Sequence, residues 1–266
     1  MAAEKKTVVL TGAAGGMGSA VRRLLESMGY LVWSLDKSDT GSPNFIECDI
    51  TDSSSVRNAA EMVKSASMRI DAIVHTAGIY DMNSLVEMPE EDFVRIFNVN
   101  LFGMYRVNRE FLSLLNPQSR IVMVSSELAP LDPLPFNGIY SITKSAIEKY
   151  AYSLRMELQL LGHKVVVIRP GAVRTSLLDV SQSRIEKFCS GTELYRNTSR
   201  RFLRLVNRIE TSSVDPNKIA LKVQKALESR NPRYVYNINR SPLLRLMSAL
   251  PQHFQNYVIR KILKND

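Results

Sequence analysis

The sequence predicts an α/β fold in which a doubly wound parallel sheet carries helices on both faces. Short apolar runs alternate along the chain with longer stretches of helical periodicity, the pattern of repeated βαβ units. The runs are apolar at nearly every position, as expected for parallel strands that are buried on both faces. A glycine-rich segment follows the first run directly. In such a fold, ligands bind beyond the carboxyl ends of the strands.

The elements follow one another without a linker, an internal repeat or a low-complexity tract. The predicted strands occupy residues 6–12, 30–36, 44–49, 69–78, 119–126, 163–171 and 233–238. The predicted helices occupy residues 16–29, 53–66, 90–115 and 138–160, and a further amphipathic helical segment covers 183–209. We therefore expect one domain over residues 1–266, with 176–212 as a substrate lid and 239–266 as a basic amphipathic C-terminal tail.

The composition is that of a globular protein with ample material for a core, since 45% of the 266 residues are hydrophobic and 23% are charged. No run of eighteen apolar residues predicts a membrane span, and the N-terminal segment lacks the apolar core of a signal peptide. The two cysteines, Cys48 and Cys189, lie far apart in no ligand spacing. We therefore expect a cytoplasmic location, no metal site and no disulfide framework.

The positive charge is concentrated in the last third of the chain. Residues 1–180 hold 18 Lys and Arg against 20 Asp and Glu, whereas residues 181–266 hold 17 against 6. Such a segment is either a solvated helical surface or a face for an anionic ligand, a nucleic acid or a membrane. No nucleic-acid-binding motif accompanies it, so we do not expect nucleic acid as a partner.

The segment TGAAGGMG, residues 11–18, predicts a dinucleotide site of the Rossmann type. Gly12, Gly16 and Gly18 lie between the first strand and the first helix, where they allow a tight turn and the approach of a pyrophosphate to the helix N-terminus. A second indication is Asp36, which ends the second strand. Its carboxylate suits the adenosine ribose hydroxyls and would repel a 2′-phosphate, so NAD(H) is favoured over NADP(H) in spite of the neighbouring Lys37.

The third strand ends at Asp49, which could reach the adenine edge while Ile50 packs against the ring.

The segment YSITK places Tyr140 and Lys144 one helical turn apart, on one face of the helix. By itself this spacing is typical of a structural pair. With a dinucleotide motif in the same chain, it indicates an acid/base group. A tyrosine has an ordinary pKa of about 10, and a nearby ammonium should lower that value.

These motifs together resemble the short-chain dehydrogenase/reductase family, over about residues 6–175. Three further segments match the family besides the two above. HTAG at 75–78 stands where the family carries NNAG, and NVNLFG at 98–103 places Asn100 at the family's asparagine. RPGAVRT at 169–175 matches the family's PGxVxT segment. The chain departs from the family at His75 and Thr76, and in a proline-containing loop between Ser126 and Tyr140 that is one residue longer than usual. We expect His75 to be structural.

The resemblance implies the roles of the site residues. Tyr140 would be the acid/base group. Lys144 would favour the ionised form of Tyr140 and hold the nicotinamide ribose. Ser126 would bind the substrate oxygen, and Asn100 would anchor a water molecule that relays protons. Thr175 would contact the nicotinamide carboxamide. The implied cofactor-binding set is Gly12, Gly16, Met17, Gly18, Asp36, Asp49, Ile50, Ala77, Gly78, Tyr140, Lys144, Val173 and Thr175.

The substrate is expected to be a lipophilic secondary alcohol or ketone, as in hydroxysteroid- and retinol-type members. Apolar residues of the lid segment would cover it, and Leu131, Leu134 and Phe136 would flank it. The alternatives are a 3-oxoacyl-thioester reductase and a non-catalytic NAD(H)-binding redox sensor. The tail could lie on a membrane surface, close the pocket or fill a subunit interface, and by resemblance the two helices at 90–115 and 138–160 would pair in a homodimer or homotetramer.

Overall fold

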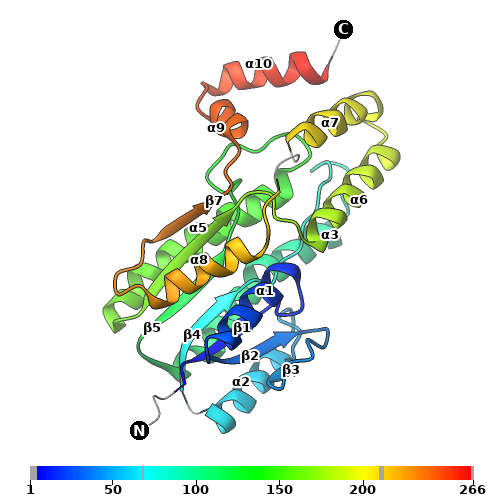
Figure 1. Cartoon of the computed structure of the whole chain (residues 1–266). Coiled ribbons are helices and arrows are strands. Elements are labelled where there is room, and N and C mark those ends of the chain that lie inside the picture. The colour runs from blue at the N-terminus through cyan, green and yellow to red at the C-terminus, as the bar shows by residue number, and fades with distance from the viewer. Residues whose placement is uncertain (1–4, 68, 210–212, 265–266) are drawn as a thin grey trace.

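The computed structural model describes residues 5–67, 69–209 and 213–264. Within them, seven parallel strands form one sheet in the order β3-β2-β1-β4-β5-β6-β7 (Figure 1). The strands are β1 Thr7–Thr11, β2 Leu31–Asp36, β3 Phe45–Glu47, β4 Ile70–His75, β5 Leu115–Val124, β6 Lys164–Pro170 and β7 Val235–Ile238. The predicted doubly wound parallel sheet is thereby confirmed, because the order reverses between β1 and β4.

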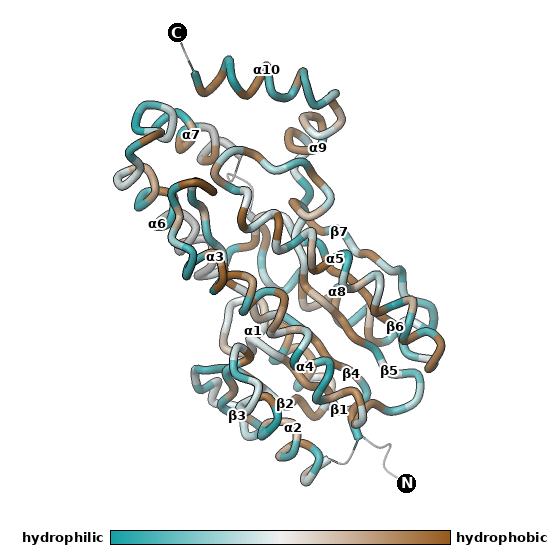
Figure 2. Tube along the Cα trace, turned by 180° about the vertical axis from the view of Figure 1, so that it is seen from behind, coloured by the Kyte–Doolittle hydropathy of each residue, from teal (hydrophilic) through white to brown (hydrophobic). Residues whose placement is uncertain are grey.

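Helices cover both faces of this sheet. On one face, α1 (Gly16–Ser27) and α8 (Asn217–Glu228) bury one side of each helix against the strands. On the other face lie α2 (Ser53–Ser67), α4 (Gly103–Phe111) and α5 (Gly138–Leu158). The trace in Figure 2 is brown along the central strands, where valine and isoleucine pack between the two helical layers. This burial is the main favourable term for the fold.

Four helices gather beyond the carboxyl ends of the strands (Figure 1). They are α6 (Ser176–Gly191), α7 (Arg196–Ile209), α9 (Pro242–Ser248) and α10 (Gln252–Leu263). A separate apolar cluster joins α6, α7 and α10, in which Ile185 of α6, Phe202 and Val206 of α7, and Leu263 of α10 pack together with Met82. The lid and tail segments of the sequence are therefore packed together here. Residues 210–212 and 265–266 of those segments lie outside the described part of the chain.

The predicted single helix at 90–115 is wrong in its middle and at its end. Instead, α3 (Glu90–Phe97) runs into a π-helical turn, η1 (Asn98–Phe102), before α4 begins, and a short 3-10 turn, η2 (Leu112–Leu114), precedes β5. The Gly103 amide donates to the Asn98 carbonyl, five residues back, which widens the turn. Asn100 lies in this turn and is held by contacts outside the helix, so its tertiary partners determine the irregularity.

Other boundaries differ as well. Helix α8 was not predicted, although Pro216 precedes it and Ile219, Ala220 and Val223 follow with helical spacing. The helical segment predicted at 183–209 is two helices, because the chain turns at Thr192–Tyr195, where the Glu87 carboxylate accepts hydrogen bonds from the Thr192 hydroxyl and the Leu194 amide. A 3-10 turn, η3 (Gln159–Leu161), ends α5. In the part of the chain that the structure describes, no helix combines the length and apolarity that a membrane span requires.

Candidate active site

The glycine-rich turn forms a cradle at the end of β1. Gly12 has a positive φ of 71°, and a side chain on it would meet the Ala77 backbone nitrogen at 2.4 Å. A side chain on Gly18 would lie 2.0 Å from the Gly12 carbonyl oxygen, and one on Gly16 would lie 2.5 Å from Thr175. No side chain caps the N-terminus of α1. Its first-turn N–H groups therefore remain available to a pyrophosphate, which fits a dinucleotide.

The two departures from NNAG at the end of β4 have structural partners. The Thr76 hydroxyl donates to the Thr11 carbonyl at 2.7 Å and so ties β4 to the glycine-rich turn. His75 is 1% exposed, and its Nε2 lies 2.8 Å from Asn108 Oδ1. Asn108 in turn donates to the Tyr150 hydroxyl on α5. Burial lowers the pKa of His75 to about 4, so the ring is neutral and joins β4, α4 and α5.

Asp36 lies at the carboxyl end of β2, beside the glycine-rich turn. Its Oδ2 accepts a hydrogen bond of 2.9 Å from the Ala14 amide, and its Oδ1 accepts one from Ser38. Each carboxylate oxygen keeps a further lone pair for a ribose hydroxyl. Lys37, the nearby cation that could favour a 2′-phosphate, pairs with Asp49 at 2.9 Å instead.

Asp49 and Ile50 are largely occupied by the protein itself. Asp49 Oδ1 accepts hydrogen bonds from the amide and the hydroxyl of Thr51. Although burial raises the pKa of Asp49, the hydrogen bonds from Thr51 and Lys37 outweigh it and hold the pKa below its ordinary value. Ile50 is 9% exposed and packs against Gly103 of α4. Most of its surface belongs to the core, which leaves only an edge for an adenine ring.

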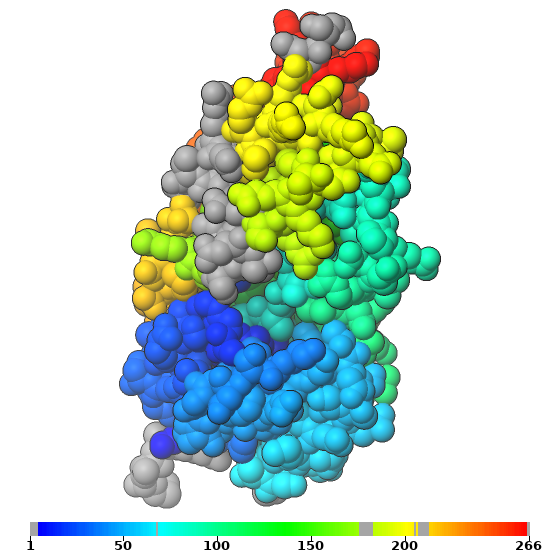
Figure 3. All heavy atoms as spheres, turned by 90° about the vertical axis from the view of Figure 1, so that its right-hand side faces the viewer, coloured from blue at the N-terminus to red at the C-terminus, as the bar shows by residue number. Residues whose placement is uncertain are grey.

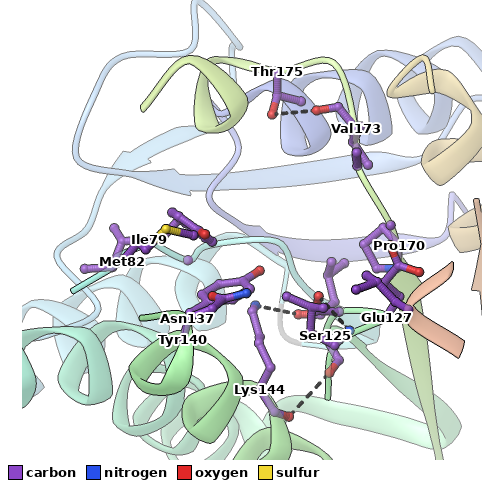
Figure 4. A pocket seen from close by; sticks show the side chains of 18 of the residues that line it. Ile79, Met82, Ser125, Glu127, Asn137, Tyr140, Lys144, Pro170, Val173 and Thr175 are labelled. Atoms are coloured by element: carbon purple, nitrogen blue, oxygen red, sulfur yellow. Dashed lines mark hydrogen bonds between the residues drawn. The ribbon is translucent and has the colours of Figure 1, made fainter. Parts of the chain in front are cut away.

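Tyr140 and Lys144 extend from the first turns of α5 into the pocket, as Figure 4 shows. Both are buried, at 8% and 5% exposed, and Lys144 Nζ lies 5.5 Å from the centre of the Tyr140 ring. The ammonium donates to the Val124 carbonyl at 3.3 Å. Tyr80 packs on the other side of the phenol, with ring centres 4.7 Å apart. Tyr80 thus helps to position Tyr140, and no motif in the sequence indicated it.

The expected lowering of the Tyr140 pKa does not occur in the chain alone. Burial raises the pKa of Tyr140 to about 12, although a hydrogen bond from Ser126 acts in the opposite direction. Burial also lowers the pKa of Lys144 to about 8. The same desolvation that disfavours the phenolate disfavours the ammonium. The phenol therefore keeps its proton at neutral pH and is ready to donate it.

Asn100 is fully buried and fixes the segment that follows β4. Its Oδ1 accepts a hydrogen bond of 2.8 Å from the Ile79 amide, while its Nδ2 donates to the Ile79 carbonyl and to the Thr143 hydroxyl. Thr143 lies between the two residues of the acid/base pair on α5. Both Nδ2 hydrogens are engaged, so the side chain acts first as a clamp between Ile79 and α5.

The end of β5 supplies two serines and a carboxylate. Ser125 donates to Glu148 Oε1 on α5, and Ser126 Oγ accepts from the Leu128 amide. The next residue, Glu127, is 7% exposed, and its Oε2 accepts a hydrogen bond of 2.6 Å from the Ser241 amide. Burial raises the pKa of Glu127. Glu127 thus joins the site to the segment before α9, a contact across 114 residues that sequence reasoning missed.

A cavity that opens to solvent lies over these groups. Ser126, Tyr140 and Lys144 line it together with Met17, Gly78, Val173 and Thr175 of the expected cofactor-binding set. Thr175 lies across the cavity from Tyr140 (Figure 4) and begins α6. Of the remaining members, Gly12, Gly16 and Gly18 form the glycine-rich turn, and Ala77 lies against it. Asp36 ends β2, and Asp49 and Ile50 follow β3.

The apolar wall of the cavity comes from elements far apart in sequence. It includes Ile79, Met82, Leu128, Leu134, Phe202, Val206 and Leu244. Two of the three expected flanking residues have other positions. Phe136 packs against Phe188 of α6 and Phe202 of α7, with ring centres 4.6 and 5.1 Å apart, and Leu131 lines a smaller neighbouring cavity. Phe136 therefore holds the lid helices in place.

A comparison with protein-family models matches residues 6–186 to the short chain dehydrogenase family. The match spans the glycine-rich turn, the end of β5 and the Tyr140–Lys144 pair. The chain belongs to the short-chain dehydrogenase/reductase family. It is an oxidoreductase that acts on CH–OH groups and uses a nicotinamide dinucleotide, as the family does.

Relatives of this short-chain dehydrogenase cover nearly its whole length. It is 26% identical to the 3-ketodihydrosphingosine reductase of Bacteroides thetaiotaomicron, over 97% of both chains. It is 27% identical to estradiol 17-beta-dehydrogenase 2 of Mus musculus, over 97% of this chain and 75% of the mouse protein.

Among solved structures, a short-chain dehydrogenase/reductase of Burkholderia phymatum in complex with NAD matches with a TM-score of 0.76 at 20% identity, over 96% of this chain and 95% of that one. A 3-ketoacyl-(acyl-carrier-protein) reductase of Brucella melitensis complexed with NADH matches with a TM-score of 0.69 at 20% identity, over 88% and 96%. These two likenesses support the fold.

Within the described residues, no group of three or more His, Cys, Asp or Glu side chains is placed to hold a metal ion.

Proposed function

We propose that this short-chain dehydrogenase interconverts a lipophilic secondary alcohol and its ketone with NAD(H). The observation that carries the proposal is the position of Tyr140, Lys144 and Ser126 at one side of a cavity whose other wall is apolar. A cavity of this kind excludes water and suits a substrate with a long or polycyclic hydrocarbon body. Two relatives that match 97% of this chain are named for 3-ketodihydrosphingosine and for estradiol, which are lipophilic compounds.

The bound dinucleotide supplies or accepts the hydride, and the chain supplies the proton and the polar contacts. In the reductive direction, Tyr140 donates its proton to the carbonyl oxygen while the Ser126 hydroxyl stabilises the developing charge. The resulting phenolate lies near the Lys144 ammonium. In the oxidative direction, the phenol must first lose its proton, which its raised pKa opposes. In the chain alone, the phenol is therefore in the protonated form that reduction uses.

The arrangement at Asp36 supports NAD(H) over NADP(H). The carboxylate would repel a 2′-phosphate, and Lys37 is held by Asp49 rather than being free to neutralise one. Asp36→Ala should raise KM for NAD at least tenfold and reduce the preference for NAD over NADP. An unchanged ratio of kcat/KM for the two cofactors would contradict this assignment.

The decisive experiment follows absorbance at 340 nm with each cofactor over hydroxysteroids, a long-chain 3-ketosphingoid base, retinol and a 3-hydroxyacyl thioester. Turnover of a lipophilic alcohol or ketone should fall by about 10²–10⁴-fold in Tyr140→Phe, while NADH binding is retained. The thioester as the best substrate would favour the acyl-reductase alternative, which the basic C-terminal third also suits. Tight NADH binding with no turnover of any compound would favour the redox sensor.

We also propose that α6 and α7 act as the substrate lid and that two copies pair through the outer faces of α4 and α5. Phe102 and Tyr105 on the first side, and Tyr152 and Met156 on the second, are each between 46% and 54% exposed. Light scattering coupled to size exclusion should give a dimer or tetramer. We expect Tyr152→Glu to shift the measured mass toward that of the monomer, and an unshifted mass would reject this interface.

The unpaired cysteines support our proposal of a cytoplasmic location.

A further inference from the structure

The helices that close the pocket carry an outer surface that is both apolar and basic. The residues of this outer surface are Leu243, Arg245, Leu246, Phe254, Tyr257, Arg260, Lys261 and Ile262, all on α9 and α10. Leu246 is 63% exposed and Tyr257 is 59% exposed. Such large apolar side chains, gathered on two adjacent helices, mark an interaction site more often than a solvated surface.

The two sides of α10 differ in what they contact. Gln255, Ile259 and Leu263, spaced four residues apart, face the body of the protein. Gln255 donates to Asp132, and the Arg201 guanidinium of α7 donates to the Leu263 carbonyl. The inner side of α10 is therefore already occupied by contacts with the rest of the protein. Helix α10 lies next to α7 at one end of the molecule (Figure 3).

The charged side chains of α7 and of the C-terminal segment have one sign. Residues 239–264 contain five Lys and Arg and no Asp or Glu, and residues 196–209 of α7 contain five arginines and no acidic residue. Arg196, Arg200 and Arg204 of α7 are exposed beside the outer surface. Along α10, hydrophilic and hydrophobic residues alternate around the helix (Figure 2). A partner surface must therefore be anionic and must also accept leucine and aromatic side chains.

We infer that this outer surface docks on an anionic lipid bilayer. Basic side chains are attracted to acidic headgroups, while leucine and aromatic side chains enter the boundary between headgroups and acyl chains. Phe254 and Tyr257 stack with ring centres 6.4 Å apart. Tyrosine is enriched at membrane interfaces, and phenylalanine is typical of the apolar face of interfacial helices. A soluble acidic protein would account for the cations, but it would also need an apolar groove shaped to these particular side chains, whereas a bilayer accepts them in any arrangement.

Docking in this way places the pocket next to the source of a lipophilic substrate. Leu244, between the exposed Leu243 and Arg245, is buried in the pocket wall. Phe202 and Val206 of α7 line the same wall. The bilayer surface would then lie about one helix diameter, roughly 10 Å, from the bound substrate. The substrate class rests on the proposed function, whereas the docking itself does not, because it can be measured without turnover.

The test is flotation of the full chain with vesicles of phosphatidylcholine alone and with 30 mol% phosphatidylserine added. We expect binding to the anionic vesicles that weakens as salt rises. Arg260→Gln with Lys261→Gln should weaken binding about 25-fold, since each cation near such a surface contributes about fivefold. The matched control is Lys218→Gln with Lys225→Gln, two exposed lysines on α8, which should bind as the parent does.

A second pair of variants tests the apolar part. Leu246→Asp should reduce binding at least tenfold, whereas Leu160→Asp, at an 83% exposed position on η3, should leave it unchanged. Circular dichroism and NADH binding verify that each variant is folded. Equal binding to neutral and anionic vesicles, or equal loss in the matched controls, would overturn the inference. So would a change from dimer to monomer in Leu246→Asp by light scattering, because a second copy would then cover this surface.

Discussion

Acidification from pH 7 to pH 5 should destabilise this protein through His75. The ring is buried and donates one hydrogen bond, from Nε2 to Asn108 Oδ1. Its pKa is about 4 in the folded chain, against an ordinary value of about 6.5. Between these values the unfolded chain binds a proton that the folded chain does not. The free energy of unfolding must therefore fall as the pH falls through this range.

The magnitude follows from the two pKa values. At pH 5 nearly every unfolded chain carries the proton and about one folded chain in ten does, whereas at pH 7 neither state is much protonated. The difference amounts to about 2 kcal/mol between the two pH values. This is a large fraction of the stability of a typical domain.

Urea unfolding, followed by circular dichroism at both pH values, measures the loss. The matched variant is His75→Asn, which keeps a side chain able to bond Asn108 but has no titrating group. The carboxylates and His163 titrate in both proteins, so their contributions to the change in stability cancel in the comparison. We expect the loss from pH 7 to pH 5 to be about 2 kcal/mol larger in the parent than in the variant. Equal losses would refute the burial argument.

Three further predictions concern the site. Gly18→Ala should weaken NADH binding at least tenfold in a fluorescence titration, because the new carbon would lie 2.0 Å from a carbonyl oxygen of the turn, whereas Gly191→Ala, in open space, should bind normally. Reductive kcat/KM should fall as the pH rises through about 8, where Lys144 loses its proton while the catalytic phenol keeps its own; a profile flat to pH 10 would contradict the role of the ammonium. Glu127→Ala should lower the free energy of unfolding by about 1–3 kcal/mol, because the partly buried Ser241 amide loses its charged acceptor, and unchanged urea unfolding would show that this contact is dispensable.

The local motifs were predictable because their chemistry resides in short segments. Gly12, Gly16 and Gly18 are adjacent in sequence, and the need for bare backbone at a helix N-terminus makes them recognisable. Tyr140 and Lys144 are related by a single helical turn. The sheet could be predicted because buried parallel strands are apolar at nearly every position, so their number and order along the chain stand out.

The order of the strands in space, the environment of the acid/base pair and the composition of the pocket wall were decided by tertiary structure alone. The raised pKa of Tyr140 depends on burial by elements such as the segment that carries Tyr80, and sequence spacing carries no information on desolvation. The π-helical turn at Asn100 depends on Ile79, and Glu127 meets Ser241 across 114 residues. Contacts between residues so far apart in sequence arise when the local elements pack together. The sequence by itself therefore determined the chemistry of the site residues, and only the fold decided the surroundings of those residues.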